Sequence, residues 1–160
     1  MEVQALDQEN HETHSESWNQ FSTFVVGSHL YGIDVTKVQE VVMPLRMTKV
    51  PLAPHFVQGL INLRGQVATA IDLRKLFNLD VNDRNKCMNV VCDHETGLLT
   101  FQVDQIGDVL QVPKSDLEST PTNINSHVRQ FLVGVYKVNQ KLLSIIDIEL
   151  IVKFVNSKIH

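Results

Sequence analysis

The sequence contains one segment twice, and this repeat constrains the fold more than any other feature. The segment GLINLRGQVATAIDL, which begins at Gly59, aligns without a gap on GVYKVNQKLLSIIDI, which begins at Gly134, at an offset of 75 residues (134 − 59). The alignment matches the two glycines and also matches Asp72 with Asp147. Apolar alternation, which any two amphipathic β segments share, does not by itself produce matched glycine and aspartate positions. The chain is therefore predicted to contain two copies of one β unit.

The repeat extends upstream of each copy. The segment YGIDVTKVQEVV, from Tyr31, aligns on LTFQVDQIGDVL, from Leu99, at an offset of 68 residues (99 − 31). The apolar positions of the two segments coincide, as expected for equivalent strands. A proline-containing connector follows each of these segments and precedes each hairpin.

Each copy has the pattern of a β-hairpin followed by a helix. Residues 56–77 contain two apolar runs joined at the polar corner Arg64-Gly65, where glycine favours a turn. Asp72 then occupies a helix N-cap position, where its carboxylate can accept hydrogen bonds from free backbone N–H groups. Asp147 has the same place before a terminal amphipathic helix, and we expect the apolar stripe of that helix to pack in the core.

The other strands are predicted from alternation and from breaker residues. Residues 18–35 form a hairpin that turns at Gly27-Ser28. The segment TKVQEVV is either a weak helix capped by Thr36 or a bent strand. Residues 87–112 give three strands, and Pro113 stops the third.

The composition excludes several classes of protein. A chain of 160 residues, 43% of them hydrophobic, can bury one core or two small cores that share an interface. The net charge of −4 and the scattered Lys and Arg residues argue against nucleic-acid binding. No run approaches the roughly 20 apolar residues of a spanning helix, and the N-terminus is acidic. We therefore expect a cytoplasmic protein without direct membrane insertion.

We expect a single domain over residues 18–155, with a tail at each end. Residues 1–17 lack apolar periodicity and cannot bury enough surface to offset the entropy of ordering, so they are predicted to be flexible. Residues 156–160 are predicted to be a C-terminal tail. His11 and His14 lie in the first tail without a further ligand nearby, and we predict no metal site there.

Signatures of enzymes are missing from the sequence. Its seven glycines form neither a dinucleotide-binding nor a phosphate-binding loop, and no nucleophile elbow occurs. Asp72 and Asp147 are followed by Leu and Ile, not by the Thr-Gly or Ser-Gly of aspartic proteases. Cys87 and Cys92 are five residues apart in a strand-like segment, so they face opposite sides and should not form a disulfide. We predict no catalytic residue, no cofactor and no metal.

Four motifs occur in a defined order along the chain: YGIDVTKVQEVV, KVPLAPHFVQGLINLRG, AIDLRKLF and VDQIGDVLQV. In this order and at these spacings they resemble the CheW family, the small coupling proteins of bacterial chemotaxis signalling. The resemblance covers about residues 21–155. It implies a mainly β fold of two small five-stranded, SH3-like barrels, intertwined and related by pseudo-twofold symmetry, with short helices. This expectation agrees with the repeat.

The resemblance also implies a function without catalysis. A protein of this kind is an adaptor, or scaffold, that couples the cytoplasmic tips of methyl-accepting chemotaxis receptors to the chemotaxis histidine kinase. The regulatory domain of that kinase resembles the same fold, which implies barrel-to-barrel pairing into rings within receptor arrays. We expect a monomer in isolation.

A receptor-binding groove is expected beside the first hairpin. The receptor would contribute a helical hairpin tip, which would lie against five residues: Val38, Glu40, Gly59, Asn62 and Arg64.

We further predict an ion pair between Glu40 and Arg64. The equivalent positions in the second copy are Asp108 (40 + 68) and Asn139 (64 + 75), so the cation occurs only once. An ion pair that stabilises the barrel itself should be present in both copies. The restriction of the Glu40–Arg64 pair to the first copy indicates a surface adapted to a partner.

Two residues depart from the family pattern. Thr69 stands where relatives commonly have Pro, and Thr100 stands where Gly often lies; both are strand positions.

Two other functions remain open at this point. One is a coupling protein of the same fold in surface motility or biofilm signalling. The other is a small β-barrel ligand-binding protein or enzyme, which would require a deep pocket with convergent polar groups.

Overall fold

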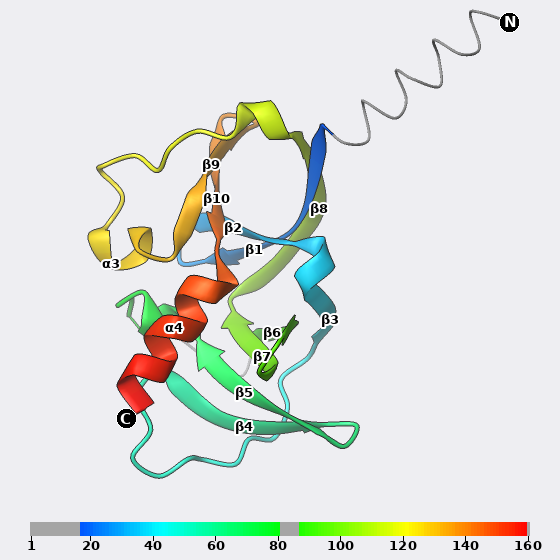
Figure 1. The fold of residues 1–160 in the computed structure, drawn as a ribbon, viewed down its shortest axis with the longest axis vertical. Coiled ribbons are helices and arrows are strands. Elements are labelled where there is room, and N and C mark those ends of the chain that lie inside the picture. The colour runs from blue at the N-terminus through cyan, green and yellow to red at the C-terminus, as the bar shows by residue number, and fades with distance from the viewer. Residues whose placement is uncertain (1–16, 81–86, 160) are drawn as a thin grey trace, which may run out of the picture.

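The structure is a computed structural model that describes residues 17–80 and 87–159. Within these ranges the fold is mainly β, as the sequence predicts (Figure 1). The strands are β1 (Trp18–Val26), β2 (His29–Asp34), β3 (Val38–Val42), β4 (Val57–Leu63), β5 (Gln66–Asp72), β6 (Met88–His94), β7 (Gly97–Val103), β8 (Gln105–Pro113), β9 (Leu132–Val138) and β10 (Lys141–Ile146). The predicted tail of residues 1–17, with its two histidines, lies outside the described residues except for Ser17.

The strands form two five-stranded sheets of identical plan. The first barrel has the strand order β3-β6-β7-β5-β4, and the second has the order β8-β1-β2-β10-β9. Each barrel contains one parallel pair, β5 with β7 and β10 with β2, among antiparallel pairs. Figure 1 shows the two barrels one above the other, with α4 beside their junction. The two sheets confirm the two five-stranded subdomains predicted from the sequence.

The two copies of the repeat exchange their first hairpins. The hairpin β1–β2 of the first copy completes the second barrel, and the hairpin β6–β7 of the second copy completes the first barrel. Neither barrel can therefore form from one copy alone. The exchange explains why the two repeats make a single intertwined unit.

Matching backbone contacts close the two barrels. In the first barrel Thr48 of the connector exchanges two hydrogen bonds with Leu60 of β4, with N–O distances of 2.9 and 2.8 Å. In the second barrel Glu118 makes the same pair of bonds with Val135 of β9, at 2.8 and 2.9 Å. Since these bonds join each connector to an edge strand, they cover edges that would otherwise expose unpaired backbone groups.

The two glycines of the repeat lie directly beneath these bridges. A Cβ atom on Gly59 would stand 2.6 Å from the carbonyl oxygen of Thr48, and one on Gly134 would stand 2.5 Å from that of Glu118. No side chain tolerates such a contact with backbone, so both positions require glycine for close approach. Gly59 also has a φ of +153°, which L residues rarely adopt.

Five helical segments are described: the 3₁₀ turns η1 (Val35–Lys37) and η3 (Lys114–Asp116), and the α-helices α2 (Leu73–Leu76), α3 (Ser126–Arg129) and α4 (Ile148–Ile159). Asp72 caps α2, since its carboxylate accepts hydrogen bonds from the N–H groups of Arg74 and Lys75 at 2.9 and 3.4 Å. At the start of α4 the Asp147 carboxylate accepts from the N–H of Glu149 at 2.9 Å. These are the capping contacts predicted for both aspartates.

Of the two alternatives for the segment TKVQEVV, the bent strand is the one present, because β3 follows a single 3₁₀ turn and is bulged between Val38 and Glu40. Two boundaries differ from the sequence prediction. The residue that caps the 3₁₀ turn is Asp34 rather than Thr36. The Asp34 carboxylate accepts from both the N–H and the hydroxyl of Thr36, and the β-branched valines that follow favour a strand. Helix α4 continues to Ile159, so residues 156–159, predicted as a tail, are helical and exposed.

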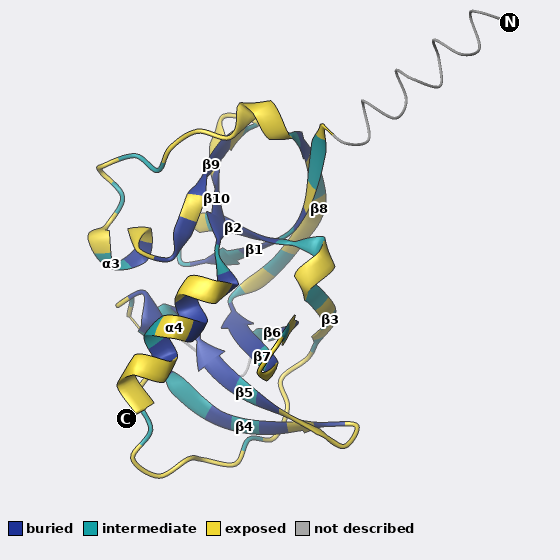
Figure 2. Ribbon diagram, viewed as in Figure 1, coloured by how far each residue is buried: buried dark blue, intermediate teal, exposed yellow. Residues whose placement is uncertain are grey.

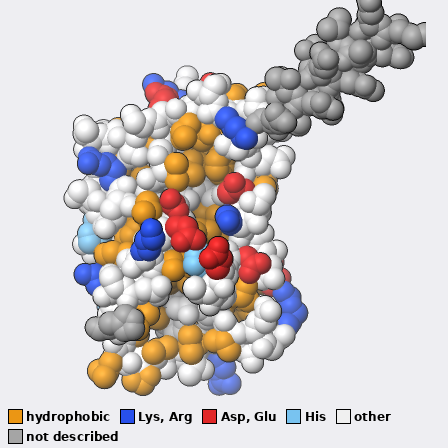
Figure 3. Space-filling model, viewed as in Figure 1, with side chains coloured by type: hydrophobic (Ala, Val, Ile, Leu, Met, Phe, Trp, Pro, Cys, Tyr) orange, Lys and Arg blue, Asp and Glu red, His pale blue; other side chains and the backbone are white. Residues whose placement is uncertain are grey.

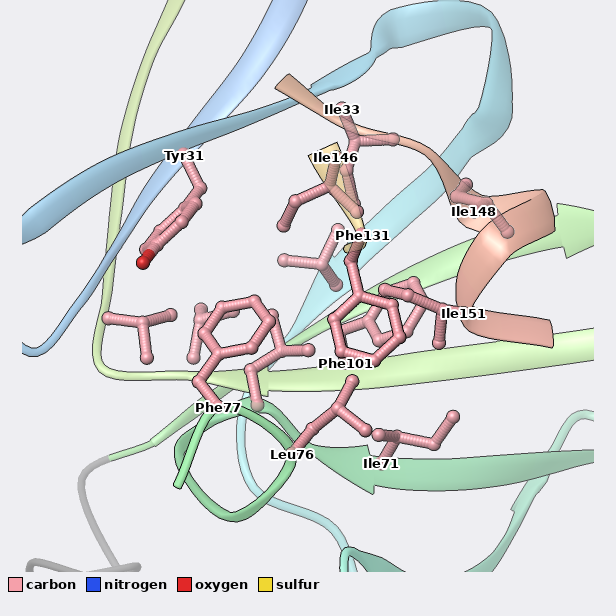
Figure 4. Packing of buried hydrophobic residues seen from close by; sticks show 14 of the residues in the cluster. Tyr31, Ile33, Ile71, Leu76, Phe77, Phe101, Phe131, Ile146, Ile148 and Ile151 are labelled. Atoms are coloured by element: carbon pink, nitrogen blue, oxygen red, sulfur yellow. The ribbon is translucent and has the colours of Figure 1, made fainter. Parts of the chain in front are cut away.

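The core has one shared part and one small part inside each barrel. The shared cluster includes Phe77 of α2's C-terminus, Phe131 before β9 and Tyr31 of β2, and thus joins both copies. The rings of Phe77 and Phe131 lie 6.2 Å apart and those of Tyr31 and Phe77 lie 5.2 Å apart, so the aromatic side chains of the two barrels pack on one another (Figure 4). Figure 2 shows the buried strand faces, with exposed residues concentrated in turns, connectors and one side of α4.

The cysteines are free thiols, both buried. Cys92 lies in β6, whereas Cys87 precedes that strand. Burial raises the pKa of the Cys92 thiol to about 12, so the group is neutral and unreactive at ordinary pH. Among the helices described, none is long and apolar enough to cross a membrane.

Candidate functional site

The tip of the β4–β5 hairpin carries the predicted ion pair. Arg64 and Gly65 form the two-residue turn with φ values of 50° and 87°, and the Asn62 side chain accepts a hydrogen bond from the N–H of Gly65 at 3.0 Å. This turn directs the Arg64 guanidinium to β3, where it donates to the carboxylate of Glu40. The predicted Glu40–Arg64 pair is therefore present.

The pair lies on the surface of the first barrel. The Arg64 side chain is 72% exposed and that of Glu40 is 25% exposed. Exposed ion pairs contribute only about 0–1 kcal/mol to folding. An exposed guanidinium has further N–H donors available, so this residue is better suited to binding another molecule than to holding the barrel together.

The same turn in the second barrel has the same backbone and different chemistry. Asn139 and Gln140 adopt φ values of 49° and 66°, matching Arg64 and Gly65. Asn139 has no charge, and so it cannot form an ion pair with Asp108, the residue equivalent to Glu40. The shape of the turn thus repeats, and the cation does not.

The other residues predicted for the groove have different positions. Gly59 is buried beneath the connector and contributes shape rather than a contact surface. Val38, in β3, is half-buried and packs against the shared core. Glu40, Asn62 and Arg64 are thus brought together at the hairpin tip, while Val38 and Gly59 support the strands on which these residues stand.

The junctions between the barrels contain features that the sequence analysis missed. At one junction Arg74 of α2 forms a two-pronged ion pair with Asp104, with N–O distances of 2.7 to 3.0 Å. The Asp104 carboxylate also accepts from the N–H of Gly27 at 2.7 Å, so the pair joins α2 to the β1–β2 turn of the other barrel. The hydrogen bond to Asp104 raises the pKa of Arg74. Both side chains are 15% exposed, which makes this pair structural.

At the equivalent junction the ring of His94 in β6 lies 2.7 Å from the Glu149 carboxylate of α4, and a cleft remains beside this contact; we call it the open junction. A cleft of about 630 Å³ lies between β1, β2 and β9 of the second barrel, η1, the β6–β7 turn and the start of α4. Its walls carry Phe21, Tyr136 and Ile145 beside several carboxylates. Figure 3 shows acidic side chains grouped near the middle of this face, next to hydrophobic ones. The offset of 75 residues pairs Arg74 with Glu149 (74 + 75). This reversal of charge is the sequence signal that could have revealed the difference between the two junctions.

The described part of the chain shows no evident catalytic centre. Across residues 17–80 and 87–159, no three His, Cys, Asp or Glu side chains lie close enough to hold a metal ion. The predicted groove residues line none of the walls of this cleft. The described residues thus form two barrels that share a core and carry chemically distinct outer surfaces.

The family is established by comparison with known proteins. The family model of the CheW-like domain matches residues 20–155. The chain belongs to this family. Two similar proteins are the chemotaxis proteins CheW of Bacillus subtilis, 34% identical over 128 residues (78% of this chain and 80% of that protein), and of Helicobacter pylori, 30% identical over 135 residues (84% and 81%).

A solved structure gives the same result. The crystal structure of the scaffolding protein TtCheW from Thermoanaerobacter tengcongensis superposes with a TM-score of 0.73 and 29% sequence identity, covering 81% of this chain and 88% of that one. As a member of this family, the protein is a non-enzymatic coupling scaffold of chemotaxis signal transduction.

Proposed function

We propose that the protein acts in the cytoplasm, where it couples the tips of methyl-accepting chemotaxis receptors to the regulatory domain of the chemotaxis histidine kinase. Family membership supports this assignment. Such a scaffold works by presenting two surfaces at once, so that a change in the receptor alters the geometry in which the kinase is held. The kinase domain pairs with the barrels, and the receptor tip binds the first barrel.

The receptor surface is the hairpin tip with Glu40, Asn62 and Arg64, supported by Val38 and Gly59. The observation that carries this part of the proposal is the Glu40–Arg64 pair, which occurs in one of two barrels with the same turn backbone. A planar guanidinium can hold the Glu40 carboxylate while it presents further donors to a partner helix. The pair therefore shapes a polar patch at the first hairpin tip, whereas the equivalent turn of the second barrel, Asn139-Gln140, carries no cation.

The test compares charge reversals in the two barrels. Arg64→Glu should abolish assembly of the ternary complex with receptor-bearing membranes and kinase, measured by co-sedimentation, while circular dichroism shows an intact fold. The matched control is Lys137→Glu in β9, because Lys137 is 73% exposed and lies 3.8 Å from Glu118 in the second barrel. This control should assemble normally.

A double exchange separates the pair from the single charge. Glu40→Arg combined with Arg64→Glu should restore part of the assembly if the ion pair itself shapes the surface. Normal assembly of the Arg64→Glu variant would remove the receptor surface from this site. A double variant no better than the single variants would limit the role to Arg64.

A further inference from the structure

We propose that the open cleft at the junction of the barrels is a separate binding site for a protein segment that inserts an apolar side chain flanked by Arg or Lys. The site is distinct from the hairpin tip, because none of the residues of the tip lines the cleft. Its three supporting observations are an apolar floor, an acidic rim and the contrast with the closed junction.

The floor of the cleft is apolar and continues to the protein surface. Phe21, Tyr136 and Ile145 belong to the small core of the second barrel and also line the cleft. At its edge Leu117 and Val133 are 41% and 53% exposed. Covering such aliphatic surface removes apolar area from water, which favours association. A volume of about 630 Å³ accommodates several side chains of a partner.

The rim of the cleft is acidic. Five carboxylates line it: Asp34, Asp93, Glu95, Asp147 and Glu149. Lys37 and His94 are the basic side chains among the lining residues. The ring of His94 contacts the Glu149 carboxylate at 2.7 Å, yet Glu149 remains 58% exposed and can accept from a further donor. The charge balance of the rim therefore favours a cationic partner.

At the closed junction, the one with the Arg74–Asp104 pair, side chains of this chain occupy the space equivalent to the cleft. There Arg74 pairs with Asp104, and Lys75 donates to the Gln58 side chain at 2.7 Å. Gln58 is the extra residue of a bulge in β4, and Val133 is its equivalent in β9 (58 + 75). At the open junction the two helix cations are replaced by Glu149 and Leu150.

Lys37 and His94 face five carboxylates among the residues that line the open junction, so the excess of negative charge favours a cation from another molecule. Residues 1–16 of the chain carry five acidic residues and neither Lys nor Arg, so charge does not favour this segment as the occupant. A segment of another protein with a leucine-like side chain next to Arg or Lys matches both the floor and the rim.

The test uses a defined probe, a blocked 14-residue peptide with leucines at helical spacing and arginines between them. Its binding to the full chain is followed by ¹⁵N chemical shifts, which should move at residues lining the cleft. A second peptide with Glu in place of Arg should bind at least about tenfold more weakly. In the protein, Glu149→Lys should weaken binding of the arginine peptide by about tenfold, and Val133→Gln should weaken it severalfold.

Two matched variants control for general effects of charge and hydrophobicity. Asp108→Lys and Val109→Gln change an exposed carboxylate and an exposed valine of β8 that lie outside the cleft lining. Both should bind the arginine peptide as the parent does. The proposal is overturned by no shifts at millimolar peptide, by equal binding of the glutamate peptide, or by equal losses in the control variants. It is also overturned if the chain dimerises and the cleft variants abolish the dimer, because a second copy would then be the occupant.

Discussion

The two barrels have the same backbone plan and different surface charges. Each barrel takes two strands from the other copy, is closed by a connector bridge over a glycine, and turns its second hairpin through two residues of positive φ. The charges of the side chains differ at the hairpin tip and in the first turn of the following helix. Arg64 and Arg74 in the first copy correspond to Asn139 and Glu149 in the second.

This comparison separates what builds the fold from what distinguishes its surfaces. Backbone hydrogen bonds, glycines and capping aspartates are shared, because both copies must satisfy the same strand edges and helix ends. Exposed charges are not shared, because they contribute little to folding and can change without destabilising the barrel. Four changes, in order of decreasing effect on the free energy of unfolding, test this separation.

The largest effect is expected for the two bridging glycines. Gly59→Ala and Gly134→Ala should each lower the free energy of unfolding by about 2–3 kcal/mol, because the new Cβ would collide with a backbone carbonyl oxygen. Guanidinium unfolding measures both. Gly65→Ala is the control. The φ of Gly65 is +87°, but a Cβ added there would meet no atom within 4 Å, so the free energy of unfolding should fall by only about 1 kcal/mol. If only one of the bridging glycines mattered, the barrels would not share this constraint.

The next effect distinguishes the two junctions. Arg74→Gln should cost about 2 kcal/mol, less than the ~3–5 kcal/mol of a fully buried pair, because both partners retain 15% exposure. Glu149→Gln, at the equivalent position, should cost less than about 1 kcal/mol, since Glu149 is largely exposed. Thermal and chemical unfolding of the two variants provide the comparison, and equal losses would show that the junctions are energetically alike.

A smaller effect concerns the exchanged hairpins at high pH. Burial raises the pKa of Cys92 from 9.0 to about 12, while its equivalent in the other hairpin is Phe24 (92 − 68), which does not titrate. The unfolded thiol ionises at a lower pH than the folded one, so stability should fall as pH rises from about 9 towards 12. Tyr31, whose pKa burial raises from 10.0 to about 12, adds to the loss above pH 10. Cys92→Ala should flatten the decline between about pH 9 and 10; an unchanged decline would contradict this assignment.

The smallest effect is expected for the exposed pairs. Arg64→Gln and Lys137→Gln remove cations that are 72% and 73% exposed, one from each barrel. Each should change the free energy of unfolding by less than about 1 kcal/mol. A loss above about 2 kcal/mol for Arg64→Gln alone would make its pair with Glu40 part of the barrel's structure.

Much of this molecule could be predicted from its sequence because the repeat makes each copy a check on the other. The glycine match at Gly59 and Gly134, the aspartate caps and the Glu40–Arg64 pair all follow from local patterns or from the alignment of the two copies. These features depend on residues whose backbone or capping roles are specific.

The exchange of hairpins could not be predicted in the same way. Equivalent hairpins present similar edges, so the sequence does not indicate which copy of β1–β2 or β6–β7 completes a given barrel. The Arg74–Asp104 pair also depends on this exchange, because it joins α2 to the region between the barrels. The cap at Asp34 and the extension of α4 to Ile159 show the usual uncertainty of helix boundaries.

The most direct test of the account makes the first hairpin tip resemble the second. Arg64→Asn places at the first turn the residue found at Asn139, and the turn should keep its backbone because Asn tolerates positive φ. We predict an unchanged fold and free energy of unfolding, with loss of ternary-complex assembly in co-sedimentation with receptor-bearing membranes and kinase. Normal assembly of this variant would contradict the claim that recognition depends on side chains present in only one of the two barrels.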